Sequence, residues 1–329
     1  MSLREVYDLS LAALRGSGAS LQQAGPVAES IRDAEAQGIR NVGLGYLPVY
    51  CAHLRCGKVN GQAVPHVTQS APSWLRVDAG HGFCHPAFVQ ALPLLLEMTR
   101  RNGVAAMAIA NSYSAGVVGW FVEKLAAEGL VALAFANTSP CIAPWGGNKA
   151  LFGTNPIAFA APLDDTPVVV DMAASATARV NIVSAASKGE RVPATWLVDA
   201  HGVPTSDPNA LKDGATMSPL GGAKGYGLAL MVEIMAAGLT GANWSYQASS
   251  FSTDEGGPPA VGQMFIALSP ALTGAAGFGD RLGALAEKVH EQSGARLPGE
   301  RRHAHRVVAA SQGVSVPEDL IEVLIGLSA

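Results

Sequence analysis

Residues 137–171 read NTSPCIAPWGGNKALFGTNPIAFAAPLDDTPVVVD, and the rest of the chain is organised around this stretch. Apolar runs typical of buried strands bound it, Val131–Ala136 before and Val168–Val170 near its end. Between them Pro and Gly turn the backbone repeatedly, and short hydroxyl and amide side chains at the turns bond backbone groups or a ligand. The pattern fits a binding cleft over a rigid scaffold, and it fits a proline-stiffened surface connection equally well.

The composition indicates an apolar protein that associates with itself. The chain has 329 residues, which predicts two intimately packed lobes rather than separable domains. Apolar residues make up 49% and charged residues only 15%, too few charges to coat a monomer, so we expect an oligomer. A net charge of −4 without a basic tract argues against nucleic acid and against an anionic membrane as partners.

The expected compartment is the cytoplasm. Four cysteines are scattered without CxxC spacing, which is typical of reduced, buried thiols. The first residues lack the apolar core of a signal peptide. The apolar run Leu228–Leu239 is too short for a membrane span and contains Glu233.

The chain is predicted to begin with helices and then to alternate between strands and helices. Residues 3–37 carry apolar residues at helical spacing, with breaks near Gly16–Gly18 and at Gly25-Pro26, so two helices are predicted. From Gly103 the pattern changes to strand, helix and strand, which marks an α/β region. These three elements are Val104–Ile109, Ala115–Glu128 and Val131–Ala136.

Lys224 is the most informative single charge. It follows Gly221-Gly222-Ala223 at the start of an apolar helix, where the helix dipole disfavours a cation by ~0.3–1 kcal/mol. An anion held jointly by the ammonium and free helix N–H groups explains this lysine, and so does a solvated lysine in a surface turn. Neither a GxGxxG motif after an N-terminal strand nor a GxxxxGK[ST] motif is present, so the Rossmann and P-loop routes to phosphate are not supported.

Asp171 directly follows the apolar run Val168–Val170. A carboxylate at the end of a buried strand is costly unless it is paired or hydrogen-bonded, and perturbed carboxylates concentrate in clefts. We therefore favour a functional role, orienting a proton donor or holding a substrate nitrogen, over a cap for the next segment.

The eight histidines show no metal-ligand spacing with a nearby carboxylate, so no metal site is expected. His81 and His85 flank the start of a predicted helix. A capping or partly buried role is favoured for both over a place in a cleft.

Several motifs, taken in order, resemble the malate/L-lactate dehydrogenase-type family of oxidoreductases, whose fold is not of the Rossmann type. The likeness extends over nearly the whole chain and is highly specific. Other motifs resemble one branch of the family, the Δ1-piperideine-2-carboxylate and Δ1-pyrroline-2-carboxylate reductases, which form L-pipecolate and L-proline. The family motifs are Asn137–Pro140, Gly153–Ala158, Asp171–Ala173, Pro204–Pro208 and Gly221–Gly225; the branch motifs are Val77–Phe83, Leu151–Asn155, Leu239–Asn243 and Arg296–Arg302.

The resemblance implies an α/β, non-Rossmann NAD(P)-binding fold with a largely antiparallel central sheet flanked by helices, plus a mostly helical lobe from both chain ends. It implies that residues 1–112 and 290–329 form a substrate and dimerisation lobe. Residues 113–289 would form the NAD(P)-binding lobe, with the active site between the lobes of a homodimer.

Residue by residue, the resemblance assigns Asp171 to the position of the family's charge-relay aspartate. Tyr46, Tyr113 and His81 are expected at the substrate, together with the edge of the central stretch, Thr138, Ser139 and Pro140. The cofactor is expected to contact Ser114, Ala115, Gly116, Thr138, Met172, Ala173, Lys224, Pro298, Gly299, Glu300, Arg301 and Arg302.

The first family loop departs from the pattern. Relatives carry Ser-His-Gly followed by an Arg, whereas this chain has Asn41-Val42-Gly43 followed by Tyr46. At the position of the family's proton-donating His this chain thus has Val42, and at the position of its Ser partner it has Asn41. At the position of the carboxylate-binding Arg it has Tyr46. The position of a second family His is occupied by Ser114, so both histidines of the family pattern are absent from this chain. Asn41 and Ser114 occupy catalytic positions, and with Tyr46 and Tyr113 they are expected to shape the pocket or relay a proton.

The missing imidazoles favour one reaction over another. Reducing a ketone places negative charge on oxygen, so a positioned acid contributes ~10²–10⁴-fold. A cyclic imine that enters already protonated does not need that donor, and Asp171 is suited to stabilise the iminium. We therefore predict an NAD(P)H-dependent reductase of a small cyclic ketimine carboxylate or a related C=N substrate. NADPH is the expected cofactor and NADH the alternative; Arg301 and Arg302 are candidates for a 2′-phosphate.

Two alternatives stay open. One is a 2-oxoacid/2-hydroxyacid dehydrogenase of the malate, lactate or ureidoglycolate type that recruits His81 or Tyr46 as its acid. The other is a dimeric cofactor-binding homologue without catalysis.

Overall fold

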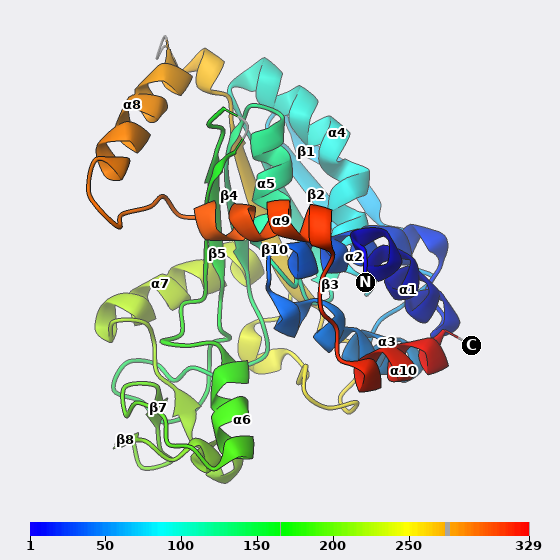
Figure 1. Ribbon diagram of the computed structural model, residues 1–329, viewed down its shortest axis with the longest axis vertical. Helices are drawn as coiled ribbons and strands as arrows, with labels where there is room; N and C mark the ends of the chain where they lie inside the picture. The colour runs from blue at the N-terminus through cyan, green and yellow to red at the C-terminus, as the bar shows by residue number, and fades with distance from the viewer. Residues whose placement is uncertain (165, 274–276, 329) are drawn as a thin grey trace.

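A seven-stranded sheet forms the centre of the computed structural model, which describes residues 1–164, 166–273 and 277–328 (Figure 1). Its strand order is β1-β2-β3-β10-β4-β5-β6, and every neighbouring pair is antiparallel except β2 with β3. The predicted α/β fold with a largely antiparallel central sheet is confirmed. The strands are β1 (His66–Ala71), β2 (Trp74–Asp78), β3 (Val104–Ser112), β4 (Val131–Ala136), β5 (Ile157–Ala161), β6 (Val168–Met172) and β10 (Val261–Leu268).

Helices surround the sheet and build a second core beside it. They are α1 (Leu3–Gly16), α2 (Leu21–Ala36), α3 (Leu47–Arg55), α4 (Cys84–Asn102), α5 (Gly119–Ala127), α6 (Arg179–Lys188), α7 (Ala223–Glu233), α8 (Phe278–His290), α9 (Glu300–Gln312) and α10 (Glu318–Leu327). Across the described residues, none of these helices combines the length and apolar character needed to span a bilayer.

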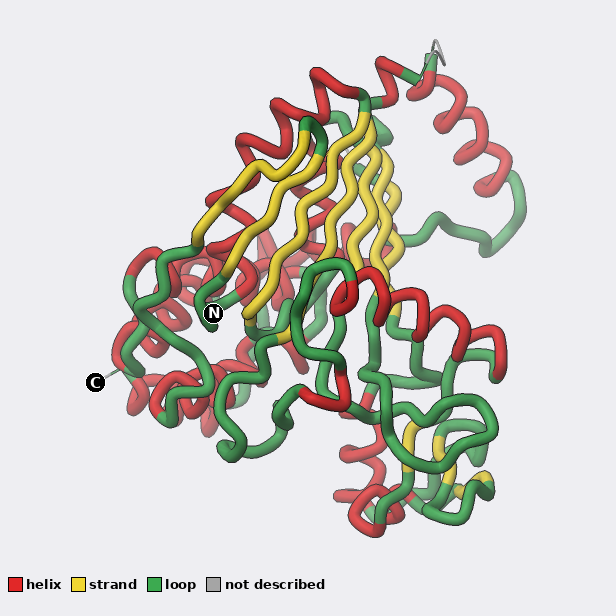
Figure 2. Tube along the Cα trace, turned by 180° about the vertical axis from the view of Figure 1, so that it is seen from behind, coloured by secondary structure: helices red, strands yellow, loops and turns green. Residues whose placement is uncertain are grey.

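The central strands are buried on both faces. Helices α4 and α5 lie on one face, where the rings of Phe88, Phe121 and Phe265 meet at centroid distances of 5.0, 4.9 and 5.1 Å. On the other face Met264 packs near Ala236 in the π-helical continuation of α7, and Figure 2 views the sheet from that side. Burial on both faces explains why these strands are continuous apolar runs without polar alternation.

The second core joins the two ends of the chain. Helices α1, α2, α3 and α10 pack around Leu14, Ile31 and Leu47 (Figure 1). The amino group of Met1 donates to the carbonyl of Val314 at 2.9 Å, which fixes the first residues beside the C-terminal segment.

One predicted helix boundary is wrong. No break occurs at Gly25-Pro26, because α2 runs on with Pro26 inside it. The Ser20 side chain caps the helix by accepting the Gln23 N–H at 3.2 Å, and Ile31 on the same helix is buried. An internal proline costs about 3 kcal/mol in an isolated helix, so tertiary packing of the apolar face outweighs the local signal.

A buried polar network anchors the central stretch 137–171. The Asn155 side-chain amide donates to Glu233 Oε2 at 2.7 Å and to the Ala229 carbonyl at 2.9 Å. Glu233 also accepts from the Ser245 N–H at 2.5 Å and from the Ser245 hydroxyl at 2.6 Å. A buried carboxylate needs such donors, and together they hold α7 against the stretch.

Beyond the stretch lies a smaller sheet with the order β8-β7-β9, formed by β7 (Leu197–Val198), β8 (Pro204–Thr205) and β9 (Thr216–Met217) (Figure 1). It shares a core with α6 and α7, in which Ile142 of the central stretch bridges to Phe152 and to Met217.

The start of α7 depends on a close backbone approach at Gly225. A Cβ there would lie 1.8 Å from the Leu220 carbonyl oxygen, so Gly225→Ala is expected to cost about 1–3 kcal/mol of unfolding free energy. Gly227 in the same helix has open space, and Gly227→Ala is expected to add about 0.5–1 kcal/mol. Chemical denaturation of both variants measures their unfolding free energies. Equal values would contradict the close backbone approach at Gly225.

Candidate active site

Three side chains on one face of α3 begin the candidate site. Tyr46 precedes the helix, and Tyr50 and His53 follow at spacings of four and three residues, which place them on the same helix face. Tyr113, just beyond β3, packs against them, with its ring centroid 5.9 Å from that of Tyr50 and 5.6 Å from that of His53. We call these four residues the tyrosine cluster.

Two hydroxyl groups of this cluster have hydrogen-bond partners. The Tyr113 hydroxyl shares a hydrogen bond with His53 Nδ1, and the Tyr46 hydroxyl donates to the Phe251 carbonyl at 3.3 Å. Burial raises the pKa of Tyr46, against a smaller opposing effect of hydrogen bonding with Tyr113. Burial likewise raises the pKa of Tyr50. These phenols therefore stay protonated at neutral pH and serve as donors.

A buried lysine closes one side of the cluster. Lys58 is 1% exposed, and its ammonium donates to the carbonyls of Ser250, Thr253 and Glu255 at 2.5, 2.7 and 2.6 Å. All three N–H donors are thereby used. They clamp the loop that brings Phe251 against Tyr113, with ring centroids 5.1 Å apart.

The loop 114–118 leads from the cluster to α5. The Ser114 hydroxyl accepts the Gly116 N–H at 3.3 Å, and Gly116 has a φ of +59°, which favours glycine. A Cβ at Gly116 would lie 3.2 Å from the Tyr50 hydroxyl and 3.8 Å from His85 Nε2. Burial lowers the pKa of His85 to about 3, so this imidazole is neutral. Its burial agrees with the favoured interpretation of His85 and excludes it as a charged acid.

Asp171 holds the far end of this loop. Its Oδ2 accepts the Gly119 N–H at the start of α5 and the Arg302 guanidinium from α9, each at 3.1 Å. Arg302 also donates to the Asp171 carbonyl at 3.4 Å. The carboxylate is thus paired, as its position after a buried strand requires. It joins β6, α5 and α9 at one point.

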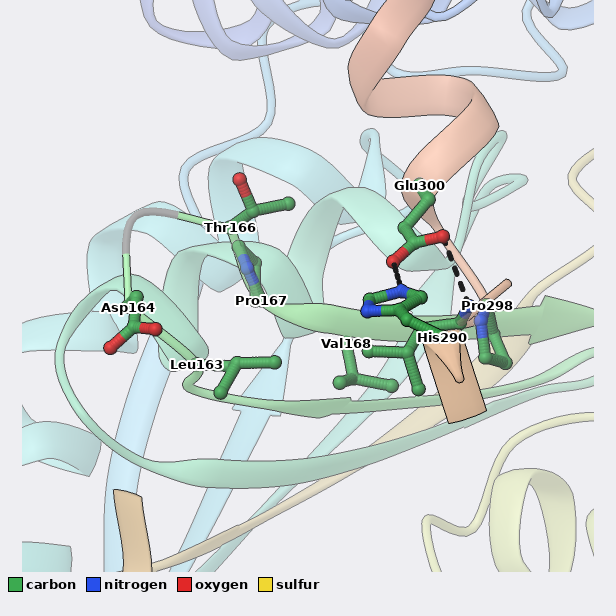
Figure 3. Close-up of a pocket in the computed structure, with 9 residues that line it drawn as sticks. Leu163, Asp164, Thr166, Pro167, Val168, His290, Pro298 and Glu300 are labelled. Carbon is green, nitrogen blue, oxygen red and sulfur yellow. Dashed lines mark hydrogen bonds and ion pairs between the residues drawn. The ribbon is translucent and has the colours of Figure 1, made fainter. Parts of the chain in front are cut away.

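The turn before α9 runs beside β6. The Pro298 carbonyl accepts the Val169 N–H at 3.1 Å. Glu300 Oε1 lies 2.5 Å from His290 Nε2, and Glu300 Oε2 accepts the Leu297 N–H at 3.1 Å (Figure 3). A cavity of about 270 Å³ is lined here by Leu163, Asp164, Thr166, Pro167, Val168, His290, Leu297, Pro298 and Glu300.

Backbone hydrogen bonds continue from Asp171 to α7. The Ala174 N–H donates to the Thr154 carbonyl at 2.8 Å, and the Leu220 N–H to the Ala174 carbonyl at 2.8 Å. The Thr154 N–H donates to the Thr138 hydroxyl at 3.0 Å. Together with the preceding contacts, these bonds connect many of the predicted residues in series from Tyr46 to Lys224, and we call this set of residues the wall.

The α7 end of this wall combines an exposed cation with a helix N-terminus. Lys224 is exposed in the first turn, Gly222 caps the helix with a φ of +70°, and the first N–H groups of any helix have no partner within it. A cation beside a helix N-terminus is the donor set expected for an anionic group such as the pyrophosphate or phosphate of a dinucleotide. Lys224 lies in the first turn of a helix, as predicted, and its contact with a phosphate stays a prediction.

Other predicted residues lie at the margins. Asn41 is exposed in the 3₁₀ turn Arg40–Val42, and His81 is exposed in the turn after β2 with a φ of +63°. Ser139 and Pro140 are half-buried beside Thr138. Within the described ranges, no hydrogen bond joins the side chain of Asn41 or His81 to the wall. In the same part of the chain, no group of three or more His, Cys, Asp and Glu residues is placed to hold a metal ion.

Sequence reasoning missed Tyr50, His53, Lys58 and Asp254, and it missed the pairing of Asp171 with Arg302. The helical spacing of Tyr46, Tyr50 and His53 was a usable signal for two of them. Lys58 and Asp254 carry no local signal, because the fold alone brings the loop 250–255 to α3.

Comparisons with known proteins identify one family. The malate/L-lactate dehydrogenase family matches residues 1–325. The (2R)-3-sulfolactate dehydrogenase (NADP(+)) of Chromohalobacter salexigens is 43% identical, with 98% of this chain and 96% of that protein covered. The Δ1-pyrroline-2-carboxylate/Δ1-piperideine-2-carboxylate reductase of Pseudomonas putida is 39% identical, with 97% and 94% covered. The crystal structure of Δ1-piperideine-2-carboxylate reductase from Pseudomonas syringae has a TM-score of 0.95 at 37% identity and 99% coverage of both chains.

The pairing of Asp171 with Arg302 is tested by a double-mutant cycle. Asp171→Asn keeps an acceptor for the Gly119 N–H and removes the charge, and Arg302→Met keeps the aliphatic volume. Each is expected to destabilise the fold, and the double variant by less than the sum, with a coupling of about 0.5–3 kcal/mol. Urea denaturation of all four proteins gives the coupling; strictly additive losses would contradict the pair.

Proposed function

The chain belongs to the malate/L-lactate dehydrogenase family of oxidoreductases, and from this premise we propose that it reduces the C=N bond of a small cyclic ketimine carboxylate with NAD(P)H. The family resemblance predicted from the sequence is confirmed, as is the likeness to the cyclic imine reductases. Substrates of the Δ1-piperideine-2-carboxylate and Δ1-pyrroline-2-carboxylate type are the ones we propose.

The observation that carries this choice is the hydroxyl-lined tyrosine cluster. Where relatives are expected to carry His and Arg, this chain has Tyr46 and Ser114, and the nearby phenols are kept neutral by burial. Neutral hydroxyls are weaker acids than an imidazolium. They suit a substrate nitrogen that carries or readily takes a proton better than a ketone oxygen that becomes an alkoxide.

The wall supplies the groups that this reaction requires. A bound NAD(P)H would supply hydride to the imine carbon. Lys224 and the start of α7 are proposed to hold its phosphates, with Ala115, Gly116, Thr138, Met172, Ala173 and the turn Pro298–Arg301 as further contacts. The exposed Arg301 is the better candidate for a 2′-phosphate, because Arg302 is paired; this favours NADPH over NADH. Asp171 Oδ2 is occupied, so charge stabilisation of the substrate is proposed for Oδ1.

A second candidate has its own support. The 43% identical relative is named a (2R)-3-sulfolactate dehydrogenase (NADP(+)). In that reaction Tyr46 would donate a proton to a 2-oxoacid. A cofactor-binding homologue without turnover is the third candidate.

We also propose a homodimer with the substrate lobe formed by residues 1–112 and 290–329 and the NAD(P) lobe by residues 113–289. The low charge content supports it, and so do apolar side chains on α7 and its continuation. Leu230, Met231 and Ile234 there are 37%, 41% and 47% exposed.

Cofactor oxidation on a substrate panel separates the candidates. Purified protein with NADPH is expected to turn over Δ1-piperideine-2-carboxylate with a kcat/KM well above those for pyruvate, oxaloacetate and 3-sulfopyruvate. Preference for an oxoacid would establish the second candidate. Cofactor binding without turnover on the whole panel would establish the third.

Lys224→Ala is expected to raise the Kd for NADPH about 10- to 100-fold, because a hydrogen bond to a charged group contributes about 1.5–3 kcal/mol. Fluorescence titration measures it. Lys188→Ala, at the exposed end of α6, removes the same charge away from the wall and should leave the Kd unchanged. Equal affinities for the Lys224 variant and the unmodified protein would refute the phosphate site.

A further inference from the structure

A polar groove lies on the face of the central sheet that is opposite to Asp171. Along β2, Leu75 and Val77 point into the core shared with α4 and α5, so Arg76 and Asp78 point to the other face. Asp171 contacts α5, on the core side. The groove has a volume of about 410 Å³, which is within the range of small-molecule sites. Figure 2 shows the strands from the groove side.

Short side chains on β3 give the groove its depth. In the parallel register of β2 and β3, Ala108 lies beside Arg76 and Ala110 lies beside Asp78. On the other side of β2, the antiparallel register places Thr68 of β1 opposite Arg76. All five residues line the groove. The two alanines thus leave room for a ligand next to a cation and an anion.

The two charges of the groove are not paired with each other. Arg76 and Asp78 are about 7 Å apart along the strand and share one face. Over residues 1–164, 166–273 and 277–328, no ion pair or hydrogen bond involves the Arg76 guanidinium. Asp78 Oδ1 accepts the Gly80 N–H at 2.9 Å and the Asn111 side-chain amide at 3.2 Å, whereas Oδ2 accepts from no group in the same ranges. The groove therefore presents a free cation and a free carboxylate oxygen side by side.

We propose that this groove binds a small α-amino acid, whose carboxylate pairs with Arg76 and whose protonated amine pairs with Asp78. A guanidinium binds a carboxylate through two parallel N–H groups. The two bonds at Oδ1 orient the Asp78 carboxylate and leave Oδ2 for the amine. The side chain or ring of the amino acid then rests on Ala108 and Ala110. This inference goes beyond the proposed function and does not depend on it.

The charge pattern selects a zwitterion over other ligands. A dicarboxylate or a phosphate brings a second negative charge against Asp78, and a diamine brings a second positive charge against Arg76; like charges at such distances repel each other. A neutral molecule leaves both charges without a counter-charge. His66 and Thr68 form the outer rim and share a hydrogen bond at 3.4 Å, so the rim adds polar atoms without a fixed negative charge.

Titration of the cofactor-free protein with L-proline tests the site directly. In protein that carries ¹³C-labelled alanine methyl groups, the NMR signals of Ala108 and Ala110 should shift and saturate. The variants Ala108→Gly and Ala110→Gly assign the two signals. L-Proline belongs to the product class of the proposed reaction, so the binding is read at these two methyl groups and not from inhibition. If neither signal moves, the inference is overturned.

Arg76→Gln removes the cation and should raise the Kd for L-proline at these methyl groups at least about tenfold. Arg101→Gln, at an exposed position of α4, removes the same charge outside the groove and should leave the Kd unchanged. Equal Kd values for the two variants would contradict the proposed contact. Light scattering should give Arg76→Gln the same mass as the unmodified protein. A smaller mass would make Arg76 a contact between two copies of the chain and overturn the inference.

Asp78→Asn tests the amine contact, because an amide oxygen remains as acceptor for Gly80 and Asn111 while the charge is lost. The unmodified protein should bind L-proline at least about tenfold more tightly than cyclopentanecarboxylate, which has the same ring size without the nitrogen. In Asp78→Asn this preference should fall toward one. Equal affinities of the unmodified protein for the two compounds would show that the groove does not recognise the amine, and the inference would fail.

Discussion

The Asp171 carboxylate holds three elements of the candidate site together by a hydrogen bond and an ion pair. It ends the edge strand β6, accepts the first N–H of α5 and pairs with Arg302 of α9. A partly buried charge at a strand end is unfavourable alone, so the helix N-terminus and the guanidinium are its necessary partners. Because three elements meet there, the loop 114–118, the segment 172–174 and the turn 297–302 are all placed relative to one carboxylate.

Aromatic hydroxyl groups gather beside α3. The tyrosine cluster packs by edge-to-face contacts, such as that between Tyr46 and Tyr50 at 4.9 Å, which fix the rings by packing as well as by hydrogen bonds. Burial raises the pKa values of these phenols.

The buried charge of Lys58 holds a loop that is far from it in the sequence. Its ammonium has exchanged water for three carbonyls of the loop 250–255. Most side chains of this loop are exposed, yet its backbone is held by Lys58, which lies shortly after α3. The same charge lies beside His53 and disfavours a second cation there. One residue thus sets both the geometry and the charge state of its surroundings.

The sequence by itself determined what local pattern can encode: an apolar strand ending near Asp171, a helix starting just before Lys224, and motifs whose order identifies the family. It also carried the spacing of Tyr46 and His53 on one helix face. It did not determine that Pro26 lies within a helix, because packing of the apolar face decided that. Only the tertiary structure paired Asp171 with Arg302 and brought Asp254 to His53. Such contacts join residues far apart in the chain, and their individual side chains are compatible with many partners until the fold selects one.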